Sequence, residues 1–381
     1  MHAVSLSDIV QRQRVNAALW HIFVGDALSM PVHWFYRRGD IQRAFPPNGI
    51  ERFEAAPALH PSSIMSLHST SRGGRGAQRP EPSVVGDVIL KGKARYWGQP
   101  NRHYHHGMPA GENTLNAWCA RHMLQWTSAH GDGPMHINDW LEHYEWFMTA
   151  EPPLHPDTYA ESYHREFFAN RIAGRALSDC GGHTHDTPSM GALVTMLPFA
   201  LALMPAHTID SVKSQCRKLV YATHPDALLM HVVDACVELM AALFSAAPDD
   251  VVSLCCEASE VVPGGNIRRY FPAPPIHNKK VLRLVSDDSE VIGRRYSPAC
   301  YITDSWPGVC YLLAKYYQTP QTALLVNTNL GGENAHRGSV LGCLLGLAGG
   351  DRVALYRQLN HYEALNSEIN TWCSRFYASR N

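Results

Sequence analysis

The segment NLGGENAHRGSVLG, residues 329–342, carries the side chains best suited to chemistry. Two adjacent glycines, Gly331 and Gly332, precede the acid Glu333, and paired glycines let a backbone come close to a ligand. Glu333 and His336 are three residues apart, so they share one face if the chain is helical there. A helix cap explains one polar residue but not this whole run. We therefore predict a ligand-binding or catalytic site built on these residues.

A second acidic segment, GMPAGENTLN, covers residues 107–116 and comes just before an apolar helical pattern. Asn113 or Thr114 at a helix N-cap, with Glu112 favoured by the helix dipole, explains it without a site. Alternatively, Glu112 and Asn113 present oxygen atoms to a cation or a sugar. Both interpretations stay open.

The segment GHTHDTPSMG at residues 182–191 places two histidines beside an aspartate between glycines. His183, His185 and Asp186 resemble a metal-ligand cluster, although H-x-H-D alone is a weak signal. Asp186 or Thr187 capping a helix that begins at Pro188 accounts for the same residues. We favour the cap, with His183 and His185 lining a cleft.

The first apolar run of the chain, from Val15, ends in the turn GDALSMPVH at residues 25–33. Asp26 lies where the partial negative charge of a helix C-terminus makes a carboxylate unfavourable without a partner. Asp26 is therefore a candidate for ligand binding, and a solvated turn residue is the alternative. His33 closes the segment.

The composition combines few formal charges with many imidazoles: 33 Lys and Arg, 34 Asp and Glu, and 22 His in 381 residues. A net charge of −1 argues against nucleic acid or an anionic membrane as a partner. The ten cysteines include no C-x-x-C pair, and the N-terminal sequence MHAVSLSDIVQRQR lacks a signal-peptide pattern, so we expect a reducing, cytoplasmic location. The longest apolar runs reach about 14 residues, fewer than the ~20 that span a bilayer.

Helical periodicity dominates the chain and predicts an all-α fold in a single domain, residues 1–381. After the first helix, residues 46–112 break the pattern and are rich in Pro, Gly, Ser, His and Arg, which indicates a long loop or lid. Only SVVGDVIL (83–90) and KKVLRLVS (279–286) resemble strands. The predicted helices that follow the loop cover 114–128, 137–150, 157–176, 188–203, 211–223, 225–246, 251–262, 305–317, 320–330, 336–347 and 362–376.

Taken in order, these segments resemble the motifs of the ADP-ribosylglycohydrolase family, which includes the dinitrogenase-reductase-activating glycohydrolase and a lens crystallin. GDALSMPVH is similar to the family's G-D-A-L-G-x-x-x-E, and GENT at 111–114 falls where the family has T-D-D-T. THPD at 223–226 is similar to a T-H-P-D helix start. SWPGVCYLLAKY and NLGGENAHRGSVLGCLLGLAGG resemble S-V-P-A-A-L-Y and N-x-G-G-D-T-D-T-x-A-A-x-x-G-A-L-x-G-A. The resemblance covers essentially the whole chain and implies a compact helical fold with long loop insertions.

The resemblance also implies a metal site with altered ligands. Family members hold two Mg²⁺ ions between the T-D-D-T and D-x-D-T loops and cleave a glycosidic bond to ADP-ribose. The family's glutamate in the opening motif corresponds to His33 here. The corresponding positions in the two loops are Gly111, Glu112, Asn113, Glu333, Ala335 and His336.

These positions supply two carboxylates where the family supplies four. Because two Mg²⁺ ions bring four positive charges, we expect either one softer divalent ion, such as Mn²⁺ or Zn²⁺, or no metal. The metal ligands are then Glu112, Asn113, Glu333 and His336. Without metal, Glu112 and Glu333 would form an acid/base carboxylate pair across the cleft. His33, His183, His185 and His336 would then transfer protons or form hydrogen bonds to the ligand.

Three hypotheses follow from the resemblance. The first is a hydrolase of a glycosidic bond in an ADP-ribosylated or nucleoside-like substrate, with a non-standard metal site. The second is an inactive family member that binds ADP-ribose or an ADP-ribosylated protein. The third is a structural role. We rank the hydrolase first, because the altered site positions carry polar, chemically competent residues.

Overall fold

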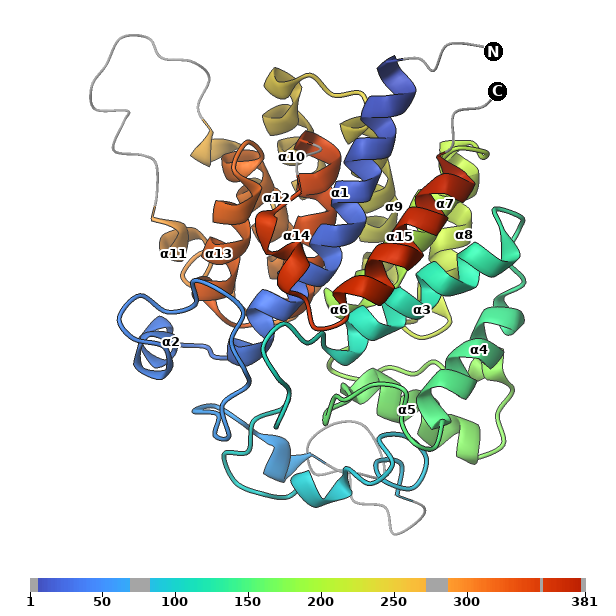
Figure 1. Cartoon of the computed structure of the whole chain (residues 1–381), viewed down its shortest axis with the longest axis vertical. Coiled ribbons are helices and arrows are strands. Elements are labelled where there is room, and N and C mark those ends of the chain that lie inside the picture. The colour runs from blue at the N-terminus through green and yellow to red at the C-terminus, as the bar shows by residue number, and fades with distance from the viewer. Residues whose placement is uncertain (1–5, 69–82, 272–286, 350–351, 378–381) are drawn as a thin grey trace.

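The fold is known from a computed structural model, which describes residues 6–68, 83–271, 287–349 and 352–377 (Figure 1). These residues form helices joined by loops and contain no β-strand, so the all-α prediction is confirmed. The expected strand at 83–90 is a turn closed by one isolated bridge between Val85 and Ile89, and residues 279–286 lie outside the described residues. No helix in the described ranges is long and apolar enough to cross a membrane.

Two central helices, α1 (Leu6–Ser29) and α14 (Asn334–Gly349), pack against each other along most of their length. Their close approach depends on glycines four residues apart on α14. A Cβ atom on Gly342 would lie 2.3 Å from the carbonyl oxygen of His21, and one on Gly346 would lie 2.2 Å from the amide nitrogen of Ala18. The pairing brings the end of α1 to the beginning of α14, which is where two of the polar segments meet.

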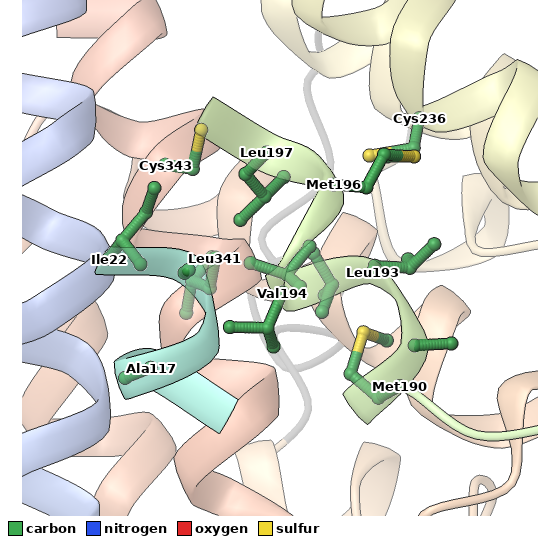
Figure 2. Close-up of a cluster of buried hydrophobic side chains, with 14 of the residues drawn as sticks. Ile22, Ala117, Met190, Leu193, Val194, Met196, Leu197, Cys236, Leu341 and Cys343 are labelled. Carbon is green, nitrogen blue, oxygen red and sulfur yellow. The ribbon is translucent and has the colours of Figure 1, made fainter. Parts of the chain in front are cut away.

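The other helices surround this pair and bury its apolar surfaces. Figure 2 shows one such region, where Ile22 of α1 and Leu341 of α14 pack near Ala117 and Val194. The surrounding helices are α2 (Arg38–Ala44), α3 (Leu115–His130), α4 (Ile137–Thr149), α5 (Ser162–Ile172), α6 (Gly191–Val194), α7 (Met196–Leu203), α8 (Ile209–Tyr221), α9 (Ala227–Leu243), α10 (Val251–Ser259), α11 (Asp288–Val291), α12 (Ile302–Tyr316), α13 (Pro320–Leu330) and α15 (Tyr362–Phe376).

Two expected helices differ from the structure for local reasons. The pattern over 157–176 predicts a long helix, but α5 begins only at Ser162, because the Asp157 carboxylate accepts hydrogen bonds from the amides of Thr158 and Tyr159. The predicted helix 188–203 begins at Gly191 instead and divides into α6 and α7. Its expected first turn forms a bridge to Tyr301 through Ser189.

The long segment 46–112 contains the short 3₁₀ helices Met65–Leu67 and Ala94–Tyr96 in its described parts. It contributes more to the core than its composition predicts, because Val84, Ile89 and Trp97 are buried in the main hydrophobic cluster. Residues 69–82 of this segment lie outside the described residues. Its action as a lid stays a prediction.

Candidate active site

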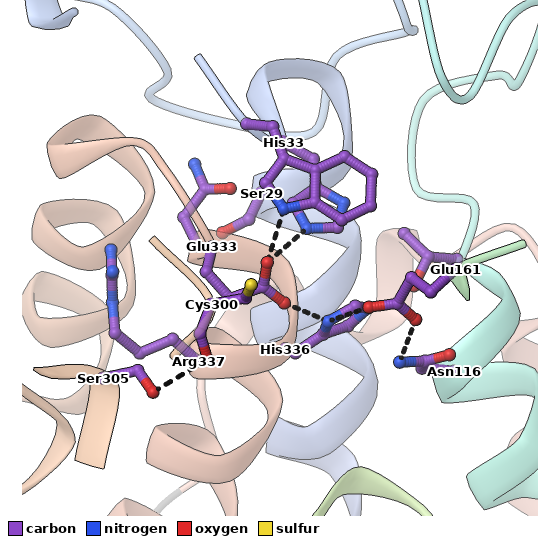
Figure 3. Close-up of polar contacts among 12 residues, drawn as sticks. Ser29, His33, Asn116, Glu161, Cys300, Ser305, Glu333, His336 and Arg337 are labelled. Carbon is purple, nitrogen blue, oxygen red and sulfur yellow. Dashed lines mark hydrogen bonds and ion pairs between the residues drawn. The ribbon is translucent and has the colours of Figure 1, made fainter. Parts of the chain in front are cut away.

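A buried cluster of His33, Glu333 and His336 lies where the end of α1 meets the beginning of α14 (Figure 3). One ligand atom from each side chain lies within 4.8 Å of the others, and no other group of His, Cys, Asp or Glu among the described residues is arranged in this way. The atoms facing one another are His33 Nε2, Glu333 Oε1 and His336 Nδ1; the last two form a close ion pair, and His33 Nε2 makes no hydrogen bond. A buried ring nitrogen without a hydrogen bond beside this ion pair marks the cluster as a place for a cation or a ligand.

Trp34 holds the Glu333 carboxylate from the pocket side. Its indole nitrogen donates a hydrogen bond of 2.5 Å to Glu333 Oε2, and its ring stacks on His33 with 3.7 Å between centroids. Trp34 has a φ of 63°, a region that costs a non-glycine residue about 1–3 kcal/mol. The contact of its amide with the carbonyl of Gly332, at 2.8 Å, helps to hold this conformation, so backbone strain here positions a side chain of the site.

On the other side of the cluster, His336 lies between two carboxylates. Its Nδ1 contacts Glu333 Oε1 closely and is 3.4 Å from Glu161 Oε1, and Asn116 donates to the second oxygen of Glu161 at 2.8 Å. Burial alone would lower the pKa of His336, but Glu161 and Glu333 outweigh it and raise that pKa to about 10. Without a metal ion the His336 imidazolium is therefore the cation that compensates Glu333, whose pKa lies below its usual range.

A chain of hydrogen bonds leads away from His33 to a buried aspartate. His33 Nδ1 lies 2.8 Å from His105 Nε2, and His105 Nδ1 lies 2.8 Å from Asp157 Oδ1. Burial raises the pKa of Asp157, but His105 and backbone amides outweigh that effect and leave the pKa below its usual value. Asp157 is therefore a carboxylate, and the two rings extend its hydrogen bonds to the cluster.

A pocket of about 640 Å³ opens beside Trp34. Its lining is largely aromatic, which suits the face of a base or a sugar. Its polar members include Asp186 and Cys300. The full lining is Trp34, Tyr36, Ser62, Ile64, His68, Tyr104, Tyr159, His185, Asp186, Ala299, Cys300 and Tyr301.

The structure does not bring the predicted pair of Glu112 and Asn113 into this cluster. Glu112 accepts hydrogen bonds from the amide of Asn113 and from Trp118 on one oxygen, and from Asn360 and His361 on the other. Both carboxylate oxygens thus accept hydrogen bonds, from donors at the beginning of α3 and just before α15. No contact joins Glu112 to Glu333 among the described residues, so their action as an acid/base pair stays a prediction.

Asn113 and Asp26 join α1 to the beginning of α3. The Asn113 side-chain nitrogen donates to Asp26 Oδ1 at 2.8 Å, and Asp26 also accepts from the amide and hydroxyl of Thr114. Asp26 is therefore not a solvated turn residue, because its carboxylate is completely buried and bonded to these groups. Its carboxylate fixes the two residues that precede α3, while the first amide of that helix, from Leu115, donates to Asp157.

The third segment divides between the pocket and the surface. Asp186 lines the pocket, and its second oxygen accepts from the amide and hydroxyl of Ser162, so it caps α5 and not the expected helix at Pro188. Burial would raise the pKa of Asp186, but hydrogen bonds from His185 and Ser162 lower it to about 2. His185 and His183 are both exposed; His185 also lines the pocket and lies 3.0 Å from Asp186.

The paired glycines approach protein backbone and not the pocket. Gly331 and Gly332 both have positive φ angles, and a Cβ atom on either would lie about 2 Å from the carbonyl oxygen of Phe35 or Pro298, respectively. They allow the turn that directs Glu333 toward Trp34. Their role here is to position the acid.

A family model and a solved structure are both similar to this chain. A model of the ADP-ribosylglycohydrolase family matches residues 7–355. The chain belongs to the ADP-ribosylglycohydrolase family. A solved structure titled "ADP-ribosylglycohydrolase-related protein complex" is similar, with a TM-score of 0.56 and 16% identity over 97% of this chain and 99% of that one. No curated protein matches the sequence.

The donor set of this ADP-ribosylglycohydrolase family member does not fit a pair of Mg²⁺ ions. Mg²⁺ requires octahedral oxygen ligands, but Glu112 is bound by four donors and Ala335 offers no ligand atom. Two imidazoles and one carboxylate, from His33, Glu333 and His336, match the ligands of a single transition-metal ion or Zn²⁺.

Sequence reasoning did not identify Trp34, His105, Asp157 and Glu161 as site residues. Trp34 directly follows the predicted His33, but a tryptophan at that position gives no signal of a left-handed backbone. His105 lies in the His-rich stretch HYHH, and Asp157 and Glu161 fall in what the periodicity assigned to a helix. Only the folded chain brings these segments together.

Proposed function

We propose that this protein is a glycosidic hydrolase that acts on an ADP-ribosylated or nucleoside-like substrate bound in the aromatic pocket. The observation that carries the proposal is the position of Glu333, whose carboxylate is fully buried and hydrogen-bonded to Trp34 in the pocket wall. A carboxylate fixed beside an aromatic pocket suits the oxocarbenium-like transition state of glycosidic cleavage. Family membership supports the same reaction class.

The proposed cofactor is one divalent ion, Zn²⁺ or Mn²⁺, held by His33, Glu333 and His336. Bound there, such an ion would lower the pKa of a water molecule and so supply a nucleophile. Three protein ligands with room for a further one are typical of catalytic sites and not of structural ones. His336 would give up the proton it carries in the metal-free state, so binding releases a proton.

The residues around the cluster have distinct roles in this proposal. Trp34 fixes the Glu333 carboxylate and excludes water from one side of it. Glu161, itself oriented by Asn116, holds His336. The aromatic rings of Tyr104 and Tyr159, which contact Trp34 edge to face, bind the base or sugar of the substrate.

The test is hydrolysis of ADP-ribosyl-arginine and ADP-ribosyl-serine, with and without Mg²⁺, Mn²⁺ and Zn²⁺. We expect turnover that Mn²⁺ or Zn²⁺ supports better than Mg²⁺, and loss of at least 100-fold in Glu333→Gln. Glu363→Gln, an exposed acid on α15, is the matched control and should retain full activity. Activity lost in Glu112→Gln but kept in Glu333→Gln would show that the site is misplaced.

A second function, binding without turnover, is favoured by one observation. Ala335 and the committed Glu112 remove ligands that the resemblance assigns to two metal ions. If no metal and no substrate gives turnover, while ADP-ribose binds at micromolar concentration by calorimetry, the protein is a binding member of the family. ADP-ribosylated protein would then be its partner.

A further inference from the structure

A buried carboxylate–histidine pair outside the cluster determines which nitrogen of His33 faces the site. Asp157 Oδ1 lies 2.8 Å from His105 Nδ1, and both side chains are almost completely buried. The same aspartate accepts the backbone amides of Leu115 and Thr158, so all the nearby donors point at a carboxylate. His105 must therefore donate through Nδ1–H to Asp157.

The direction of the remaining hydrogen bonds follows from that first one. With Nδ1 protonated, an uncharged His105 has only a lone pair at Nε2, and this atom lies 2.8 Å from His33 Nδ1. His33 must supply the proton of that hydrogen bond. An uncharged His33 with a proton on Nδ1 carries a lone pair on Nε2.

That lone pair has no hydrogen-bond donor in front of it. His33 Nε2 is fully buried without a hydrogen bond, and the nearest charged atom, Glu333 Oε2 at 3.6 Å, is itself an acceptor. Two acceptors facing each other in a buried place are unfavourable unless a cation lies nearby, and without a metal ion that cation is the His336 side chain, which contacts the other oxygen of Glu333. The neighbouring histidines His60 and His103 avoid this cost, because their Nε2 atoms bond to the backbone carbonyls of His33 and Pro31.

We infer that Asp157 and His105 are positioning residues that fix His33 in the Nδ1–H tautomer and thereby present its Nε2 lone pair to a divalent metal ion. The inference rests on the proposed function only in taking His33, Glu333 and His336 as the metal site. It adds an outer carboxylate–histidine pair to that site, built from segments that the family motifs do not include. Such outer partners typically contribute 10–100-fold to metal affinity.

The test measures metal binding and not turnover. Affinity of the full-length protein for Co²⁺ and Zn²⁺ is determined by competition with a chromophoric chelator, with the visible Co²⁺ spectrum as a second readout. His105→Leu removes both hydrogen bonds, and we expect 10–100-fold weaker binding with an altered Co²⁺ spectrum. His105→Gln keeps a donor for Asp157 and an acceptor for His33 in one amide, and should recover most of the affinity.

His103→Gln is the matched control, because His103 is equally buried two residues away but bonds to the Pro31 carbonyl and not to the His33 ring. The His103 ring also accepts the backbone amide of His105, and glutamine offers both a donor and an acceptor in its place. It should bind metal within about twofold of the wild type. If His105→Leu does not fold, the difference between His105→Gln and Asp157→Asn, which disturbs the donor–acceptor order, provides the same comparison.

Three outcomes overturn the inference: folded His105→Leu with wild-type affinity, equal loss in His105→Gln and His105→Leu, or no metal binding by the wild type above that of His33→Leu. These results are independent of hydrolysis. Wild-type protein that binds metal as expected but hydrolyses no substrate contradicts the proposed function and leaves the positioning role in place.

Discussion

Acidification from pH 7.5 to 5.5 should strongly destabilise this protein, because several of its histidines are buried in the neutral state. His21 and His155 are completely desolvated, which lowers their pKa to about 4, and burial lowers that of His224 to about 3. In the unfolded chain each pKa returns to about 6.5. As pH falls below 6.5 the unfolded state therefore takes up protons that the folded state does not, and stability falls with it.

The size of the effect follows from these three residues. At pH 5.5 an unfolded imidazole is protonated about tenfold over the neutral form, which stabilises the unfolded state by about 1.4 kcal/mol per histidine. His21, His155 and His224 together give about 4 kcal/mol, a large part of the 5–15 kcal/mol typical of a folded domain. Burial lowers the pKa of seven more histidines in the same direction: His33, His60, His103, His106, His122, His143 and His164.

Three groups have shifts of the opposite sign. Burial raises the pKa of Asp26 and raises that of Glu161 to about 7, so these two acids favour folding as pH falls and offset part of the histidine effect. The contribution of His336, whose pKa is about 10, is complete below pH 6.5 and is lost progressively as pH rises from there toward 10, so His336 also favours folding at pH 5.5 over pH 7.5 by about 1.4 kcal/mol. The histidines whose pKa burial lowers outnumber these opposing groups, so the net direction is acid destabilisation.

The assay is urea unfolding at pH 7.5 and 5.5, followed by far-ultraviolet circular dichroism. His21→Gln keeps an acceptor for the Val353 amide and removes one titrating group, so its pH difference should be about 1.4 kcal/mol smaller. His231→Gln, on an exposed position of α9, should leave the difference unchanged. A wild-type free energy of unfolding that differs by less than 1 kcal/mol between the two pH values would refute this reasoning.

Three further predictions concern single side chains. Trp34→Phe removes a hydrogen bond to a buried carboxylate, worth about 1.5–3 kcal/mol, and should lower kcat/KM about 10–100-fold. Unchanged kinetics would show that Trp34 does not contribute to the site. Arg165 is buried with no hydrogen-bond partner among the described residues, over the rings of Trp97 and Tyr159. Desolvation costs such a cation several kcal/mol, whereas the contacts with the two rings contribute about 2 kcal/mol. The Arg165→Met variant should therefore have a free energy of unfolding in urea equal to or above that of the wild type. A decrease of more than about 2 kcal/mol would contradict this account. Gly342→Ala should destabilise by about 1–3 kcal/mol in the same assay, because its Cβ atom would meet the His21 carbonyl, and a neutral effect would mean that α1 and α14 separate easily.

Helix positions were predictable where apolar periodicity and local caps agree. The predicted helices at 320–330 and 362–376 have the bounds of α13 and α15. The prediction failed at 157–161, where the Asp157 carboxylate binds backbone amides in place of a helical turn. Apolar periodicity indicates which side chains face the core. It does not reveal a side chain that accepts hydrogen bonds from backbone amides in place of helical carbonyls.

The candidate site was predicted in part. Glu333, His33 and His336 are brought together, whereas Glu112 and Asn113 bind other partners. Similarity to a family motif places Glu112 at a position along the chain. The direction of its carboxylate depends on Asn360 and His361, which lie about 250 residues away in the sequence. The composition shows the excess of histidine. It does not show that His33 and His336 belong to the buried cluster, that His105 pairs with Asp157, or that others are buried in the neutral state.

The sequence by itself determined the class of fold and the segments that carry chemistry, because periodicity, glycine pairs and polar runs are local properties of the chain. Only the tertiary structure decided which donors share a site. The close packing of α1 on α14 brings His33 to Glu333, and the long loop brings His105 between His33 and Asp157. Partners far apart in sequence determine which group donates in each hydrogen bond. That direction in turn determines which ring nitrogen of a buried histidine carries the proton.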